Sequence, residues 1–348
     1  MIEVKNLVKK YGDHTAVDHL SFHVDKGQIY GFLGPNGAGK STTMNIMTGY
    51  IASTSGEVLI DGHNILEEPE AAKKCIGYLP EQPPLYFDMT VAEYLKFAAE
   101  LKKVPKNERE TQIEQVMELT GITAMANRLI KNLSKGYKQR VGLAQAILGY
   151  PEIIILDEPT VGLDPKQIIE IRELIRQLAK KHTVILSSHI LAEVREVCDY
   201  ILIISKGKLV ASDTPENLER NLGDSDLIEI ETKASPDEVR RILETVDGIR
   251  SISTKYLENG ITWAQIQEKK NTDIREKVFQ AFAQNHQLLL KLNPLQVSLE
   301  DVFMELTQSD RAAEEYAEKA KEEGKGGHER CWRFIKEKYA PIFSLWWD

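Results

Sequence analysis

The chain has 348 residues, and its 53 Asp and Glu residues outnumber its 44 Lys and Arg residues, which gives a formal net charge of −9 at pH 7. This length predicts two or three domains, and the acidic balance argues against nucleic acid as a partner. Three cysteines far apart in the sequence predict reduced thiols in a cytosolic protein, and no stretch approaches the ~20 apolar residues of a membrane span.

The N-terminal region predicts two half-buried strands joined by a loop. Apolar and polar residues alternate at 2–4 and again at 21–24, as they do in strands with one buried face. Tyr11 lies between these segments, where it could stack on an adenine ring or pack as an ordinary loop tyrosine.

Residues 34–42, GPNGAGKST, follow an apolar run at 28–33 and contain the P-loop pattern G-x-x-x-x-G-K-[ST]. Glycines let consecutive backbone N–H groups turn toward a phosphate, and the helix that begins near Lys40 adds its positive end. We expect Lys40 to reach the β- and γ-phosphates and the Ser41 hydroxyl to bind Mg²⁺. The predicted nucleotide-binding residues of this loop are Gly34, Pro35, Asn36, Gly37, Ala38, Gly39, Lys40, Ser41 and Thr42.

A strand at 76–80 and a helical region come after the P-loop helix. Gln82 lies just past that strand, where it could orient toward Mg²⁺ or a water, or be a polar loop residue. Apolar residues recur at helical spacing over 90–101 and 108–119, and Gly121 ends the second helix. The region predicts a helical insert in an α/β domain.

The segment LSKGYKQR at 133–140 starts a helix at a serine. Ser134 could be an N-cap, and the same helix start offers an anion site.

A fully apolar strand at 153–156 ends in two carboxylates, Asp157 and Glu158. A continuous apolar run is typical of a parallel strand that is covered on both faces. We expect Asp157 to hold Mg²⁺ near the P-loop and Glu158 to accept a proton from an attacking water. A solvated acidic turn is the alternative, and the preceding P-loop favours the catalytic interpretation.

One further β-α-β unit follows. In GLDP at 162–165, Pro165 suits the first turn of a helix at 166–181. A buried strand at 183–188 then ends at His189, which could contact a γ-phosphate and position the water, or be structural. Its place one unit after Asp157 puts both residues at the same edge of the sheet.

In this order, the P-loop, Gln82, LSKGYKQR, ILDEP, GLDP and SSH resemble the ATP-binding cassette (ABC) ATPase family over residues 1–220. The resemblance implies an α/β P-loop cassette with a RecA-like core, an antiparallel β subdomain and a helical subdomain at about 85–150. It also implies ATP and Mg²⁺ as ligands. The active unit would be a homodimer, or a pseudo-dimer with a related cassette, in which each ATP lies between one P-loop and the partner's signature segment.

The resemblance assigns roles to single residues. Tyr11 would stack on adenine, with Val17 also in the nucleotide site, and Asp164 would contact the partner across the dimer. The implied catalytic residues are Glu158 as base, His189 as γ-phosphate switch, Gln82 and Lys40. The implied metal ligands are Ser41, Gln82 and Asp157. The implied signature residues of the trans site are Leu133, Ser134, Lys135, Gly136 and Tyr137.

The signature differs from the LSGGQ usual in the family. Lys135 replaces the first glycine and Tyr137 the glutamine, whereas Ser134 and Gly136 are retained. These changes bear on the geometry and rate of the trans site, and the variant is similar to that of many type-2 exporters.

Residues 225–307 predict a ferredoxin-like α+β domain in the order β-α-β-β-α-β. The expected strands are 227–230, 249–256, 261–267 and 287–292, and the expected helices are 236–246 and 273–285. Residues 217–224 resemble a linker, and VSLEDVF near the end is similar to the C-terminal domain of type-2 exporter ATPases. This domain could regulate the ATPase, support the dimer or be inert.

Residues 308–348 predict a charged linker followed by an amphipathic tail. One helical face of that tail carries Trp332, Ile335, Tyr339, Ile342 and Trp346. We expect it to lie on the membrane surface or against a permease, with folding back onto its own domain as the alternative.

Together these features predict the ATP-hydrolysing subunit of an ABC exporter, held at the cytoplasmic face of the cell membrane by separate permease subunits. A regulatory or non-transport ABC ATPase that acts as a soluble interaction protein, and an importer subunit, are the alternatives.

Overall fold

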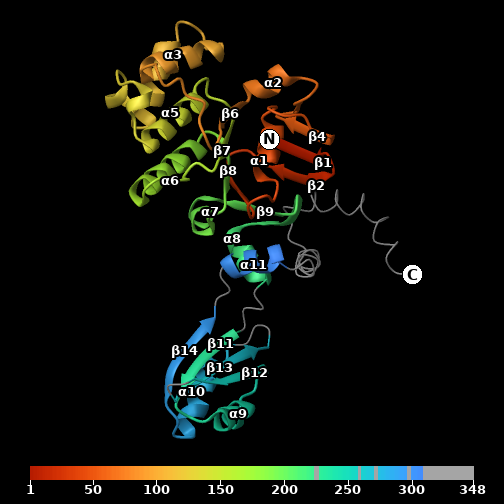
Figure 1. The fold of residues 1–348 in the computed structure, drawn as a ribbon. Helices are drawn as coiled ribbons and strands as arrows, with labels where there is room; N and C mark the ends of the chain where they lie inside the picture. The colour runs from red at the N-terminus through yellow and green to blue at the C-terminus, as the bar shows by residue number, and fades with distance from the viewer. Residues whose placement is uncertain (223–226, 258–259, 270–272, 296–298, 309–348) are drawn as a thin grey trace, which may run out of the picture. The chain divides into compact units, whose positions relative to one another are not determined.

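The computed structural model describes residues 1–222, 227–257, 260–269, 273–295 and 299–308, which form two compact units (Figure 1). The first unit is Met1–Pro215 with the described residues from Glu305, and the second is Glu216–Met304. The domain limits predicted above stay predictions, and the amphipathic tail lies outside the described residues.

A six-stranded, mostly parallel sheet is the centre of the first unit, in the order β10-β9-β3-β8-β7-β6. Its strands are β3 (Ile29–Leu33), β6 (Ile76–Leu79), β7 (Ile153–Asp157), β8 (Thr183–Ser188), β9 (Tyr200–Ser205) and β10 (Lys208–Asp213). Every residue of β3, β7 and β8 is buried, as expected for strands covered on both faces. Strands β9 and β10 form a hairpin, with positive φ at Lys206 and Gly207 in its turn.

An antiparallel sheet in the order β2-β1-β4-β5 packs beside it. Its strands are β1 (Ile2–Tyr11), β2 (His14–Val24), β4 (Ser55–Ile60) and β5 (His63–Asn64). Strands β1 and β2 are longer than the predicted strands at 2–4 and 21–24, and they continue to a tight turn in which Tyr11 pairs with His14. Register shifts between Val4 and Lys10 break the alternation of apolar and polar residues, so the sequence pattern ends earlier than the strand does.

Helices complete the first unit. They are α1 (Lys40–Met47), α2 (Pro69–Lys74), α3 (Val91–Leu101), α4 (Arg109–Leu119), α5 (Lys135–Ile147), α6 (Pro165–Ala179) and α7 (Leu191–Val197), with 3₁₀ turns at Thr123–Met125 and Ile130–Asn132. A capping box between Thr90 and Glu93 starts α3. One apolar cluster joins β1, β2, β4 and α1 to one face of the six-stranded sheet, and Val194 of α7 packs closely on Gly31 of β3.

The predicted linker at 217–224 was partly wrong, because Pro215–Leu222 forms helix α8. Proline suits the first turn of a helix, but the segment holds too few apolar residues to reveal a helical period. Leu218 is its fully buried residue.

The second unit has the β-α-β-β-α-β order predicted from the sequence. Its elements are β11 (Leu227–Thr232), α9 (Pro236–Glu244), β12 (Ile249–Tyr256), β13 (Thr262–Glu268), α10 (Arg275–Gln284) and β14 (Leu289–Leu295), followed by α11 (Leu299–Gln308). The antiparallel strands lie in the order β12-β13-β11-β14, and their alternate residues Ile228, Ile230 and Ile266 pack on Val239 and Phe282 of the two helices. The face with Glu229 is polar, since Trp263 Nε1 donates to it at 2.7 Å and Lys291 pairs with it at 2.9 Å.

Candidate functional site

The P-loop joins the buried end of β3 to the start of α1. Gly37 and Gly39 have φ of 80° and 102°, a left-handed backbone that suits glycine. A Cβ at Gly39 would also lie 2.5 Å from the Ala16 carbonyl oxygen, so this position has no room for a side chain. The loop therefore has the backbone freedom that a phosphate-binding turn requires.

Lys40 is buried, with 6% of its surface exposed, and its ammonium group points into the loop. Nζ donates to the Gly34 carbonyl oxygen at 2.6 Å and to that of Pro35 at 3.2 Å. Burial lowers the pKa of Lys40, and the Glu158 and Asp157 carboxylates oppose that shift. The group is a cation positioned to receive a phosphate.

Asp157 lies at the carboxyl end of β7, beside the start of α1. Its Oδ1 accepts hydrogen bonds from Ser187 Oγ at 2.5 Å and from Ser41 Oγ at 3.4 Å. This hydroxyl and carboxylate form the hard oxygen pair that Mg²⁺ prefers. Gln82, the third predicted ligand, is exposed beyond the end of β6, and no hydrogen bond among the described residues joins it to the other two.

Glu158 and His189 meet across the ends of β7 and β8. His189 Nδ1 lies 2.9 Å from Glu158 Oε2. Glu158 is 8% exposed, its backbone N–H donates to Ser187 Oγ at 2.9 Å, and its φ of 48° is in the left-handed region. The structure thus brings together the two residues predicted to handle the attacking water.

The signature segment begins α5. Ser134 is its N-cap, and its Oγ accepts from the Tyr137 N–H at 3.4 Å. Gly136 is buried against α6, because a Cβ there would lie 2.4 Å from Gln167 Oε1, and a Cβ at Gly162 would lie 2.1 Å from Lys135 Nζ. In the part of the chain that the structure describes, no hydrogen bond or ion pair joins the signature segment to the P-loop.

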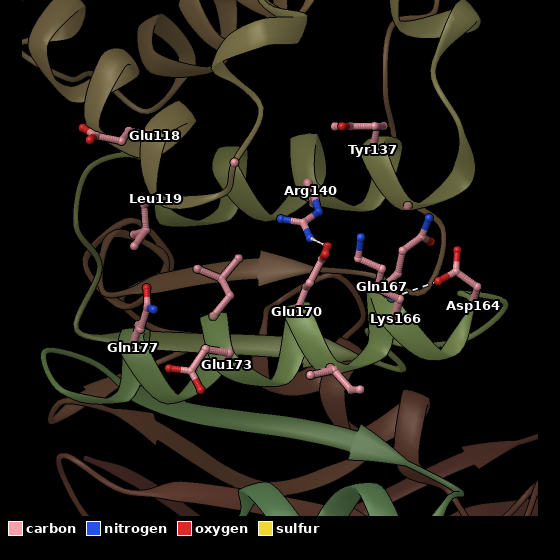
Figure 2. A pocket seen from close by; sticks show the side chains of 14 residues that line it. Glu118, Leu119, Tyr137, Arg140, Asp164, Lys166, Gln167, Glu170, Glu173 and Gln177 are labelled. Atoms are coloured by element: carbon pink, nitrogen blue, oxygen red, sulfur yellow. Dashed lines mark hydrogen bonds and ion pairs between the residues drawn. The ribbon is translucent and has the colours of Figure 1, made fainter.

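A groove of about 730 Å³ separates α4 and α5 from α6 (Figure 2). Arg140 of α5 reaches across it to pair with Glu170 of α6, and also donates to the Thr120 carbonyl oxygen at 2.8 Å. At one end Asp164 caps α6, with Oδ1 accepting from the Gln167 N–H at 2.9 Å. Sequence reasoning gave Arg140 no role, although it belongs to the signature segment.

The two predicted nucleotide-site residues outside the P-loop, Tyr11 and Val17, differ in exposure. Tyr11 is 50% exposed, and Lys9 Nζ lies 5.1 Å from the centre of its ring. Val17 is fully buried in the apolar cluster. Tyr11 is therefore open to a stacking partner, whereas a nucleotide contact of the Val17 side chain stays a prediction.

Sequence reasoning missed four polar residues beside Glu158 and His189. Ser187 binds both Asp157 and the Glu158 backbone, and the buried Glu193 accepts hydrogen bonds from Thr160 and Ser188. Consecutive hydroxyls at the end of an apolar strand were the available signal, because such groups need polar partners when buried.

Comparison with known proteins gives consistent matches. A family model described as ABC transporter matches residues 17–161. The chain is 35% identical over 320 residues to an uncharacterized ABC transporter ATP-binding protein, YhcH, of Bacillus subtilis (strain 168), which covers 91% of this chain and 99% of that protein. It is 42% identical to the bacitracin transport ATP-binding protein BcrA of Bacillus licheniformis, over 60% of this chain and 68% of that protein.

A solved structure shares the fold of the first unit. It is described as a dimeric, post-hydrolysis state of the ATP-binding cassette MJ0796 bound to ADP and Pi. The match has a TM-score of 0.57 at 27% identity, and covers 62% of this chain and 98% of the other. This likeness agrees with the order of strands and helices around the P-loop.

Proposed function

We propose that two copies of this chain, which belongs to the ABC transporter family as an ATP-binding protein, close on two ATP molecules. Closure of this dimer would drive membrane subunits that export a substrate. ATP binding and hydrolysis are the activity of the family. The Glu158–His189 contact is the observation that carries the catalytic proposal, because it joins a buried carboxylate to a histidine beside the P-loop.

In this proposal Glu158 accepts a proton from the water that attacks the γ-phosphorus, and His189 holds that water and the γ-phosphate in line. Lys40 exchanges its contacts with the Gly34 and Pro35 carbonyl oxygens for phosphate oxygens, and so stabilises the charge that develops as the bond breaks. Tyr11 stacks on the adenine with its exposed ring.

Mg²⁺ fits the oxygen donors of Ser41 and Asp157, which already approach each other at 3.4 Å. When bound there, the ion would neutralise part of the phosphate charge. Ser187 would hold the Asp157 carboxylate in place through its hydrogen bond of 2.5 Å. We include Gln82 in this site from family resemblance.

The signature segment supports a dimer, because it has no hydrogen bond to the P-loop among the described residues of its own chain. We propose that Ser134 and Gly136 contact the γ-phosphate of an ATP held by the partner, with Asp164 near the seam between copies. The dimeric relative has the same cassette fold. ATP binding would then close the dimer, and hydrolysis would open it.

We place the chain at the cytoplasmic face of the cell membrane, bound to permease subunits. No helix among the described residues is long and apolar enough to cross a bilayer, so the permeases would supply the spans. BcrA is described as a bacitracin transport protein, which favours a small molecule as the transported substrate. We take export as the direction from the resemblance of the signature segment to that of type-2 exporters. It also favours transport over a purely regulatory ATPase.

The test is phosphate release and dimer formation by wild type and Glu158→Gln. We expect the variant to lose at least about 100-fold in turnover, as removal of a general base does, and to accumulate as an ATP-bound dimer in size-exclusion chromatography with light scattering. Equal phosphate release would defeat the catalytic assignment. A variant that stays monomeric in saturating Mg-ATP, even with its membrane subunits, would defeat the dimer.

A further inference from the structure

The carboxylate of Glu193 lies between the two loops that carry the catalytic pair. It is in the first turn of α7 and is 6% exposed. Its Oε2 accepts a hydrogen bond of 2.5 Å from Thr160 Oγ1 and one of 3.4 Å from Ser188 Oγ. Thr160 comes two residues after Glu158, and Ser188 comes immediately before His189.

Glu193 has no cationic partner among the described residues, so the two hydroxyl groups are its donors. Burial of a carboxylate without a paired charge is unfavourable, and the group must be held by well-directed hydrogen bonds. An apolar residue of similar size would fill the same space at lower cost. The presence of a carboxylate therefore suggests a task beyond packing.

The two serines that end β8 hold different segments in place. Ser187 joins β8 to β7 by binding Asp157 and the Glu158 N–H. Ser188 accepts from the Ile190 N–H at 3.0 Å, which fixes the turn after His189, and donates to Glu193. The backbone around Glu158 is thus held on both sides, by Ser187 at Asp157 and at the Glu158 N–H, and by Glu193 at Thr160.

We propose that Glu193 is a positioning residue for ATP hydrolysis, which ties the segment after Glu158 to the segment that carries His189. The proposal rests on the catalytic roles proposed above for those two residues. In this role Glu193 acts through Thr160 and Ser188, and not by contact with the nucleotide or the attacking water. It fixes the 2.9 Å approach of His189 Nδ1 to Glu158 Oε2 by holding the backbone on both sides.

The experiment measures kcat and KM for Mg-ATP in the full chain with Glu193→Ala, Glu193→Gln, Thr160→Val and Thr160→Ser. We expect Glu193→Ala and Thr160→Val to lower kcat by about 10- to 100-fold, because small displacements of a catalytic group have effects of this size. KM should stay within about threefold, since the residues that bind ATP are untouched. Glu193→Gln and Thr160→Ser keep an acceptor and a donor and should recover most of kcat.

A matched control is Glu196→Gln on the same helix. Glu196 pairs with Arg172 on the exposed side of α7, so this variant should keep the wild-type kcat. Combining Glu193→Ala with Thr160→Val should lower kcat hardly further than either change alone, because both remove the same contact.

Wild-type kcat in folded Glu193→Ala and Thr160→Val would overturn the proposal, as would a rise in KM at unchanged kcat. If Glu193→Ala does not fold, the contrast between Thr160→Val and Thr160→Ser decides. Glu158→Gln is measured in the same assay. Should Glu158→Gln turn over like wild type, the proposed function fails; should it be inactive while the Glu193 and Thr160 variants are fully active, only the role of Glu193 fails.

Discussion

Lys40 is held inside the P-loop by carbonyl oxygens that cannot neutralise its charge. Hydrogen bonds to Gly34 and Pro35 satisfy two of its donors, while burial lowers its pKa. A bound triphosphate would supply the missing negative charge, so the loop is already arranged for such a ligand.

The variant Lys40→Met tests this at the level of one residue. Charge-assisted hydrogen bonds contribute about 1.5–3 kcal/mol, so we expect roughly 10- to 100-fold weaker binding of Mg-ATP. Titration calorimetry on the Glu158→Gln background avoids turnover. Lys26→Met is the control, because Lys26 pairs with Glu152 and Asp61 on the surface and should leave the affinity unchanged.

Single residues of the site were predictable where a short pattern fixes their chemistry. The P-loop, Asp157 and Glu158 follow directly from such patterns, and the structure places them at the carboxyl ends of β3 and β7, the two strands on either side of β8. The partners of Glu193 and Ser187 were not predictable, because they lie about 30 residues away in sequence and depend on which strands become neighbours.

At the scale of elements, contacts hold the C-terminal end of α5 as well as its N-terminal end, where the signature segment lies. Lys102 Nζ, after α3, donates to the Ala146 carbonyl oxygen at 2.8 Å and to that of Leu148 at 2.9 Å. Gly77 of β6 backs against the same Ala146 oxygen, where a Cβ would lie 2.3 Å away. A lysine at a helix C-terminus also suits the helix dipole.

Burial lowers the pKa of Lys102 from 10.5 to about 8. Between these values the unfolded chain binds the proton and the folded chain does not, so this group makes the protein more stable as pH rises. We expect the free energy of unfolding of wild type to rise by roughly 1–2 kcal/mol between pH 7 and pH 9.5, relative to Lys102→Met. Urea denaturation of both proteins at the two pH values measures it, and a constant difference would contradict the assignment.

Most elements were predictable because their patterns are strong. Continuous apolar runs gave β3, β7 and β8, and the alternating pattern of β11 and β13 gave the second sheet. The full lengths of β1 and β2 and the whole of α8 were not, since register shifts and a short apolar stripe remove the signal.

At the scale of the molecule, the chain divides into a nucleotide-binding unit and a smaller α+β unit. The residues proposed to bind ATP belong to the first unit. A ligand stabilises the part that binds it, so ATP should act on the two units differently.

Calorimetry of the full-length Glu158→Gln protein tests this separation. At about 100 times Kd, ATP adds about 2.7 kcal/mol, which should raise one unfolding transition by roughly 5–10 °C and leave the other in place. Ser235→Ala removes the capping box of α9 and should lower only the second transition, by about 1 kcal/mol. Movement of both transitions together under either change would show that the units unfold as one.

The left-handed backbone conformation of Glu158 lowers the stability of the folded protein. This conformation is unfavourable by about 1 kcal/mol for most residues with a Cβ. Glycine adopts it readily, and asparagine more easily than other residues with a side chain. Under the catalytic role proposed above, Glu158→Gly would relieve this strain and at the same time remove the carboxylate that accepts the proton from water. The strained turn therefore links a gain in stability at this position to a loss of hydrolysis.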